Sequence, residues 1–469
     1  MLLLCRVDIH QIVDNQYFPD AMKPFLLTSK DGARYLPAPI HRLGIGMGLL
    51  VLVATALLSG CQNDDGKSKP IGTVKIGAIY PLTGHSQSAG EDIQAAIRLA
   101  ETLINDSFEL ALPLAKPEGL PGLGGANVEV VIVDSQSNET QAAKLVERLV
   151  DEQGVVALMG CYNSPVTAAA GEQAEILRIP FLNANSTSPV LTQRGLQWFF
   201  RTTPDDTMFA ENFFTFLSQL SQQPGYTVPK RITLVYENRL WGTGVARAER
   251  KLADRFGYEV VEDVTYDAQA DGFEEELRRI HTAMPGIILQ SSYAKDAVAF
   301  VEGYKAWAIN PVAILAMDAG FVSPTFLETV GRDAEGVFSR EAWALDVSEK
   351  KPMVSTVNAL FRRRHGRNMT GNSARAFTGL VVLADAINRA GSTKADKIRK
   401  ALLDTHIPGT DLIMPWDGVR FDPDTGQNVL GKGLIVQLQK GEYVTVWPES
   451  LSTNPIRWPK PPWSETSAE

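Results

Sequence analysis

The feature of this sequence that most restricts its fold is a repeated alternation of short apolar segments with amphipathic segments, which begins at Val74. The apolar segments are rich in Val and Ile, as strands buried on both faces of a sheet are. The amphipathic segments repeat apolar residues at three-to-four spacing, as helices do. This alternation predicts an α/β protein whose parallel sheets are covered by helices on both faces. The predicted strands are VKIGAIY (74–80), VEVVIVD (128–134), VVALMG (155–160), IPFLNA (179–184), ITLVYE (232–237), GIILQSS (286–292) and VAILAMD (312–318).

The strand–helix units are too many for one compact sheet, and the chain of 469 residues is long enough for two or three domains. A Pro and a polar cluster at RTTPDD (201–206) interrupt the rhythm, and the pattern changes again near 337–350. Three helical stretches then precede a Gly-rich β segment. The expected parts are lobe 1 (72–203), lobe 2 (204–336), a returning segment that completes both lobes (337–450, with helices at 352–365, 374–390 and 394–403) and a loose C-terminal tail (451–469).

The N-terminal region has the features of a targeting sequence. Residues 43–58 form an uncharged apolar run that follows several basic residues and ends in Leu58-Ser59-Gly60-Cys61. This order describes a secretory signal peptide, and Leu-Ser-Gly-Cys resembles the lipobox of bacterial lipoproteins. We expect a signal peptide over 1–60, followed by a lipidated Cys61 and a polar tether over 61–71. If translation starts at Met22, the residues before it are an upstream extension. An uncleaved helical anchor is the alternative.

Composition and motifs argue against several classes of function. The net charge is −9 and no block of Lys and Arg is present, so we expect no nucleic-acid partner. The six His residues show no metal-ligand spacing, no phosphate-binding G-x-x-x-x-G-K-[ST] motif occurs, and Ser164 lacks the G-x-S-x-G motif. We therefore expect no enzyme activity, no metal and no cofactor. Cys161 has no disulfide partner in the predicted mature chain, and we expect it to be a buried free thiol.

Polar loops follow three predicted strands of lobe 1, at the sheet edge where α/β proteins bind ligands. Asn163, Ser164 and a Pro follow the strand at 155–160, and this order predicts a helix N-terminus able to bind a carboxylate. Asn185 and Thr187 follow the strand at 179–184, and Ser86 lies in the loop after the first strand. Each hydroxyl taken singly could be only a helix cap, but three such loops at one edge favour a binding cleft.

The same edge of lobe 2 offers aromatic and acidic side chains. Trp241 follows the strand at 232–237, Tyr293 follows 286–292, and Asp318 ends 312–318. Two rings and one carboxylate suit an ammonium group. The alternatives are a packing aromatic for Trp241, a rim position for Tyr293 and a helix cap for Asp318. A carboxylate-binding lobe that faces an ammonium-binding lobe suits a zwitterion such as an amino acid.

Nearly the whole predicted mature chain resembles the type I periplasmic substrate-binding proteins of the leucine/branched-chain amino acid transport family. The resemblance depends on the order and spacing of several motifs, none of which decides it alone. They are PLTG after the first strand, DSQSNETQAAKLVERLV, the G-x-x-x-S-P loop, NSTSPVLT, FFRTTPDD, YENRLWGTGVARA, SYAKDAVAFV and WDGVRFDPDTG. The resemblance implies a two-lobed fold with a parallel sheet flanked by helices in each lobe and a ligand cleft between the lobes.

The resemblance also implies roles for the cleft residues. Ser164 and Thr187 would hold the ligand's α-carboxylate, and the backbone carbonyl of Asn185 would accept from its ammonium group. Trp241 and Tyr293 would close over the ligand, and Asp318 would pair with the ammonium. Family members often have Tyr and Glu where this chain has Trp241 and Asp318, which leaves the side-chain preference open.

Hinge closure over the ligand is the implied mechanism, followed by delivery to an ABC permease in the inner membrane. The expected ligand is an amino acid, an amide or a short carboxylate, and the expected protein is a monomer attached to a membrane through its lipid anchor. The predicted location is the periplasm, with the choice between inner and outer membrane open. The alternative function is a ligand sensor or envelope-regulating lipoprotein that uses the same fold without transport.

Overall fold

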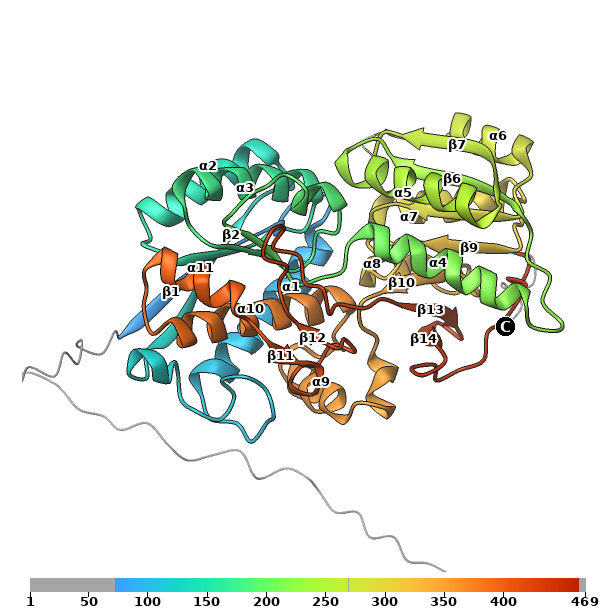
Figure 1. Cartoon of the computed structure of the whole chain (residues 1–469). Coiled ribbons are helices and arrows are strands. Elements are labelled where there is room, and N and C mark those ends of the chain that lie inside the picture. The colour runs from blue at the N-terminus through green and yellow to red at the C-terminus, as the bar shows by residue number, and fades with distance from the viewer. Residues whose placement is uncertain (1–71, 269, 464–469) are drawn as a thin grey trace, which may run out of the picture. The chain divides into compact units, whose positions relative to one another are not determined.

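The computed structural model of this protein describes residues 72–268 and 270–463, which belong to one compact unit (Figure 1). The predicted signal peptide, Cys61 and the tether lie outside the described residues. The described residues form two lobes, each built on its own sheet.

The first sheet has five parallel strands in the order β2-β1-β3-β4-β5. Its central strands are buried almost completely, which is why they read in the sequence as continuous apolar runs. The strands and the helices that follow them are β1 (Thr73–Tyr80), α1 (Gln87–Asn105), β2 (Asn127–Asp134), α2 (Glu139–Asp151), β3 (Ala157–Gly160), α3 (Ser164–Leu177), β4 (Phe181–Asn183) and β5 (Phe199–Arg201).

The second sheet has seven strands in the order β14-β13-β10-β9-β8-β6-β7, of which β6 to β10 run parallel and β13 and β14 antiparallel at one edge. Its elements are α4 (Asp206–Ser221), β6 (Arg231–Glu237), α5 (Leu240–Phe256), β7 (Glu259–Tyr266), α6 (Glu274–Ala283), β8 (Ile287–Ser291), α7 (Ala294–Ala306), β9 (Ala313–Ala316), α8 (Pro324–Val330), β10 (Phe338–Glu341), β13 (Leu434–Gln439) and β14 (Glu442–Trp447).

Between β10 and β13 the chain returns to lobe 1. Figure 1 shows α10, in orange, near α1, in blue, and the two helices pack against each other. The returning elements are α9 (Pro352–His365), α10 (Gly371–Ala390), α11 (Ala395–Leu403) and the small antiparallel pair β11 (Ile407–Pro408) and β12 (Gly418–Val419). Short 3₁₀ helices are found at Pro121–Leu123, Pro189–Thr192, Leu345–Glu349 and Gly409–Asp411. The three helices predicted after residue 350 are therefore present.

The prediction of a loose tail is wrong for residues 451–463. Trp463 is 3% exposed and its Nε1 donates to the backbone carbonyl of Ile309 at 2.5 Å. Gln437 of β13 also binds the backbone of Arg457 through both its amide nitrogen and its amide oxygen. The Pro- and Ser-rich composition of this segment suggested a loose tail, but the tryptophan supplies enough apolar surface to dock the segment on lobe 2. Residues 464–469 lie outside the described residues.

Within the described ranges, no helix combines the length and the apolar character that a membrane crossing requires.

Candidate ligand-binding cleft

One cavity takes its lining from both lobes, and six predicted ligand-binding residues lie on it. Lobe 1 contributes Ser164, Asn185 and Thr187, which follow β3 and β4 as predicted. Lobe 2 contributes Trp241, Tyr293 and Asp318. The structure therefore brings together the six residues that the sequence placed at two separate sheet edges.

The two remaining predicted residues lie beside this cavity and do not line it. Asn163 lines a neighbouring cavity of about 260 Å³ that shares Tyr293 with the first. Its amide nitrogen donates to the hydroxyl of Ser86 at 3.1 Å, and this hydrogen bond links Ser86 to Asn163. These two residues buttress the cleft wall.

Ser164 is the first residue of α3, with Asn163 as the N-cap residue and Pro165 in the first turn. The unpaired N–H groups of a helix N-terminus favour an anion. Ser164 is 2% exposed, and its hydroxyl accepts from the backbone N–H of Ser188 at 3.4 Å. The hydroxyl and the helix end make this part of the wall suitable for a carboxylate.

Aromatic rings from both lobes form another part of the wall. The ring centroids of Trp241 and Tyr293 are 4.9 Å apart, and those of Tyr162 and Tyr293 are 6.1 Å apart. Tyr293 is the N-cap residue of α7, and Trp241 lies in the first turn of α5. Together these rings offer an apolar surface for the body of a small ligand.

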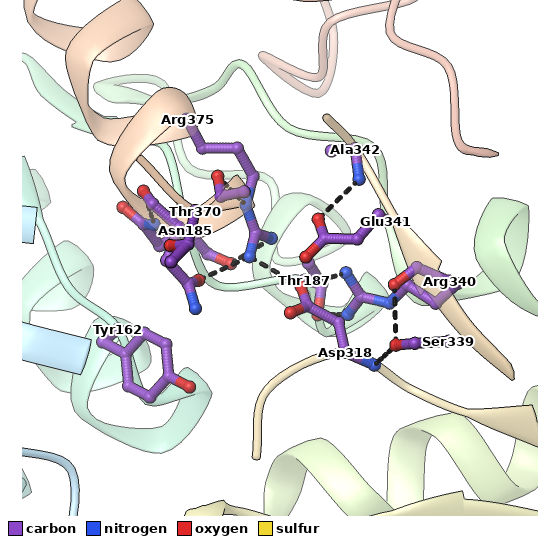
Figure 2. Close-up of polar contacts among 12 residues, drawn as sticks. Tyr162, Asn185, Thr187, Asp318, Ser339, Arg340, Glu341, Ala342, Thr370 and Arg375 are labelled. Atoms are coloured by element: carbon purple, nitrogen blue, oxygen red, sulfur yellow. Dashed lines mark hydrogen bonds and ion pairs between the residues drawn. The ribbon is translucent and has the colours of Figure 1, made fainter. Parts of the chain in front are cut away.

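Asp318 lies at the centre of a buried charge cluster (Figure 2). Its Oδ2 accepts from Nη1 of Arg340 at 2.7 Å and from Nη2 of Arg375 at 2.6 Å. Asp318 is 1% exposed and has a φ of +54°, a left-handed conformation that costs energy for a residue other than Gly. Asp318 is not the N-cap of α8, because Ser323 takes that position.

The arginines of this cluster come from different lobes. Arg340 is on β10 of lobe 2, and its Nη2 lies 3.3 Å from both the hydroxyl of Thr187 and a carboxylate oxygen of Asp206. Arg375 is on α10 of lobe 1, so its ion pair with Asp318 joins the two lobes. Burial lowers the pKa of Arg375, but the charges of Asp318 and Glu341 outweigh this effect and leave that pKa raised.

Two further carboxyl groups have shifted protonation equilibria. Burial raises the pKa of Asp206 to about 6, although the charge of Arg340 acts in the opposite direction. Burial, with the negative charge of Asp318, raises the pKa of Glu341 to about 8. Both carboxyl groups therefore take up a proton more readily than an exposed carboxyl group does.

Several lining residues were not predicted from the sequence, and the two arginines matter most among them. Arg340 lies inside a buried strand of four residues, and Arg375 lies in a buried, mostly apolar helix. In the sequence, the sign of each of these arginines was a basic residue within an otherwise buried strand or helix. The full set of missed lining residues is Tyr162, Ser186, Ala319, Arg340, Asn372 and Arg375.

The cleft cavity has a volume of only about 20 Å³, roughly the space of one water molecule. The lobes must therefore separate before a ligand of amino-acid size can enter. A larger cavity of about 390 Å³ is lined by Glu341, the neighbour of Arg340 in β10, but by none of the predicted site residues. Among residues 72–268 and 270–463, no cluster of His, Cys, Asp and Glu has the makeup of a metal site.

Comparison with known proteins agrees with this architecture. The family model described as "Periplasmic binding protein" matches residues 73–442. This chain belongs to the periplasmic binding protein family. Leu/Ile/Val-binding protein homolog 8 of Brucella abortus is 26% identical over 427 residues, which are 90% of this chain and 100% of the relative.

Solved structures share the two-lobed fold. The branched-chain amino acid transporter substrate-binding protein LivJ from Streptococcus pneumoniae, in complex with isoleucine, has a TM-score of 0.67 at 21% identity, and the match covers 80% of this chain and 100% of that one. A solute-binding protein of an ABC transporter from R. palustris, in complex with benzoate, has a TM-score of 0.67 at 17% identity, with 80% and 96% covered. At these identities the likeness establishes the fold.

Proposed function

We propose that this protein captures a small amino acid, amide or short carboxylate outside the cytoplasm by closing its lobes over the ligand. It then delivers the ligand to an ABC permease in the inner membrane. In this proposal a lipid on Cys61 holds the protein at a membrane, and the protein works as a monomer. The observation that carries the proposal is the single cavity lined by hydroxyl groups from lobe 1 and by aromatic and charged groups from lobe 2.

Family membership supports the solute-binding role. Relatives described by their ligands include a protein in complex with isoleucine and another in complex with benzoate, so the fold serves small carboxylates of different kinds. In this chain, Ser164 and Thr187 would bind the ligand's carboxylate, and Trp241 and Tyr293 would cover its apolar body. Closure over the ligand would bring Arg375 of lobe 1 against Asp318 of lobe 2, the ion pair that joins the lobes.

Thermal unfolding of residues 62–469 against a panel of amino acids, amides and short carboxylates tests the proposal. A ligand present at about 1,000 times its Kd stabilises the folded state by about 4 kcal/mol. For roughly 390 ordered residues the unfolding entropy is about 0.8 kcal/mol per kelvin, so the expected rise in Tm is about 5 °C. The Ser164→Ala variant should lose most of this rise.

Ser355→Ala is the matched control, because Ser355 lies in the first turn of α9, is exposed and does not line the cavity. This control should keep the full rise. If no compound in the panel raises the Tm of the folded protein, the proposed capture of a solute is wrong and the envelope-regulating role becomes the better hypothesis.

A further inference from the structure

The guanidinium group of Arg375 is fixed in one position by groups of its own lobe. Its Nε lies 3.3 Å from the backbone oxygen of Gly371, and its Nη2 donates to Oδ1 of Asn372 at 2.5 Å. Its Nη1 donates to the backbone oxygen of Asn185 at 3.2 Å. Arg375 is 1% exposed and lines the cleft, so these contacts hold its guanidinium as part of the cleft wall.

The position of this guanidinium coincides with the expected ammonium subsite. The two groups expected to hold a ligand's ammonium are the backbone oxygen of Asn185 and the carboxylate of Asp318. Arg375 donates to both, at 3.2 Å and 2.6 Å. A positive charge of the protein therefore stands where the α-ammonium of an amino acid would have to bind, and like charges brought together in a desolvated site repel strongly.

The other acidic groups of the cleft do not offer a substitute. Asp318 already faces a second guanidinium, that of Arg340, through the same oxygen. Asp206 is paired with Arg340, and burial raises the pKa of Glu341, which favours its uncharged form. An incoming ammonium would find the carboxylates of Asp318 and Asp206 already paired with guanidinium groups.

Unused hydrogen-bonding atoms indicate what the cleft can accept instead. Within the part of the chain that the structure describes, no group donates to Oδ1 of Asp318, although this atom is buried. A hydroxyl group can donate to it without adding positive charge. Nε of Arg340 is likewise buried without an acceptor among the described residues, and the same guanidinium lies beside the hydroxyl of Thr187, where a ligand's carboxylate is expected.

From these contacts we propose that the ligand is a small carboxylate with no α-ammonium group, and that a 2-hydroxy acid fits the cleft better than the corresponding amino acid. This inference rests on the proposed function and specifies its ligand class. Arg375 takes the place of the ligand's ammonium, Arg340 attracts the ligand's carboxylate, and Oδ1 of Asp318 accepts from the 2-hydroxyl.

Isothermal titration calorimetry with matched ligand pairs tests the inference on the unaltered protein, residues 62–469. The pairs are leucine with 2-hydroxy-4-methylpentanoate and phenylalanine with 3-phenyllactate, which differ only in the group on the α-carbon. The hydroxy acid of at least one pair should bind at least about 100-fold more tightly than its amino acid. Equal or tighter binding of the amino acid overturns the inference and leaves the proposed solute-binding function intact.

A variant isolates the role of Arg375. Arg375→Met removes the guanidinium while keeping an unbranched side chain, and the preference for the hydroxy acid should fall at least about tenfold. Arg389→Met is the control on the same helix, since Arg389 binds Asp385 and the backbone of Ala401 and does not line the cleft. The preference should be unchanged in this control. If Arg375→Met folds and keeps the full preference, Arg375 does not set the ligand class.

The wild-type comparison decides the question even if Arg375→Met fails to fold. If neither member of any pair binds and the broad panel of amino acids, amides and carboxylates also fails, the proposed function falls together with this inference. If the panel yields an amide or an amino acid as the tightest ligand, only the inference is wrong.

Discussion

Replacement of Asp318 by Asn tests whether one carboxylate holds both buried guanidinium groups. In the folded protein, Oδ2 of Asp318 accepts from Arg340 at 2.7 Å and from Arg375 at 2.6 Å, and all three side chains are at most 2% exposed. The amide would keep the shape of the side chain but remove its charge. Loss of one partner from a buried ion pair costs about 3–5 kcal/mol, because the remaining charge stays buried without compensation.

Because Glu341 lies nearby, we expect the loss in the free energy of unfolding to be at the lower end of this range. Both Arg340 and Arg375 act on its carboxyl group, which can ionise when Asp318 no longer opposes it. A loss of about 3 kcal/mol, with an unfolding entropy of about 0.8 kcal/mol per kelvin, lowers Tm by about 4 °C at pH 7. At a pH of about 9, where Glu341 ionises more readily, the loss should be smaller.

Differential scanning calorimetry of the ligand-free protein measures this effect. Asp385→Asn is the control, because Asp385 pairs with Arg389 near the surface of α10, and such pairs contribute about 0.2–1 kcal/mol. Its Tm should therefore change by about 1 °C or less. A change in the Asp318→Asn protein no larger than that of the control would refute the view that this carboxylate neutralises the cluster.

Other buried groups give three further predictions. The pKa of Glu341 is raised from 4.5 to about 8 on folding, so the folded state binds more protons than the unfolded state between these pH values. The free energy of unfolding should therefore fall as pH rises from about 5 to 8. Urea titrations should show a flatter pH dependence for Glu341→Gln. Trp463→Ala should lower the free energy of unfolding by about 3–5 kcal/mol, whereas the partly exposed Trp307→Ala should cost less than about 1 kcal/mol in the same assay. Burial raises the pKa of the Cys161 thiol, so a thiol reagent such as DTNB should modify residues 62–469 only after denaturation, and reaction at the native-state rate of an exposed thiol would contradict its burial.

Continuous apolar composition was enough to predict most of the two sheets. All seven predicted strands are present, with ends shifted by at most two residues. Six of them are interior strands, and a strand buried on both faces must be apolar throughout, so hydrophobic content alone reveals it. The seventh, β2, lies at the edge of its sheet but keeps a dense run of Val and Ile. The buried free thiol of Cys161 is also confirmed.

Strands with other environments escaped prediction. β7 (Glu259–Tyr266) is an edge strand that mixes charged and apolar residues, and β5 (Phe199–Arg201) has only three residues. β10 (Phe338–Glu341) is fully buried but carries Arg340 and Glu341, so its composition resembles a loop. In β10 the polar residues that lie at the cleft are also the residues that kept the strand from being predicted.

The same physical chemistry shows how the cleft arginines could have been found. Arg375 is the only charged residue in the first fourteen positions of α10, whose apolar sequence on all sides indicates a buried helix. A guanidinium in such a helix needs a buried carboxylate or several hydrogen-bond acceptors, because desolvation of an unpaired charge costs several kcal/mol. Asp318 was predicted to lie at the cleft because it follows a strand, so its carboxylate could have been proposed as the partner of Arg375. Pairing these two residues from the sequence would have removed Asp318 from the ammonium subsite and turned the expected ligand from a zwitterion toward a simple carboxylate.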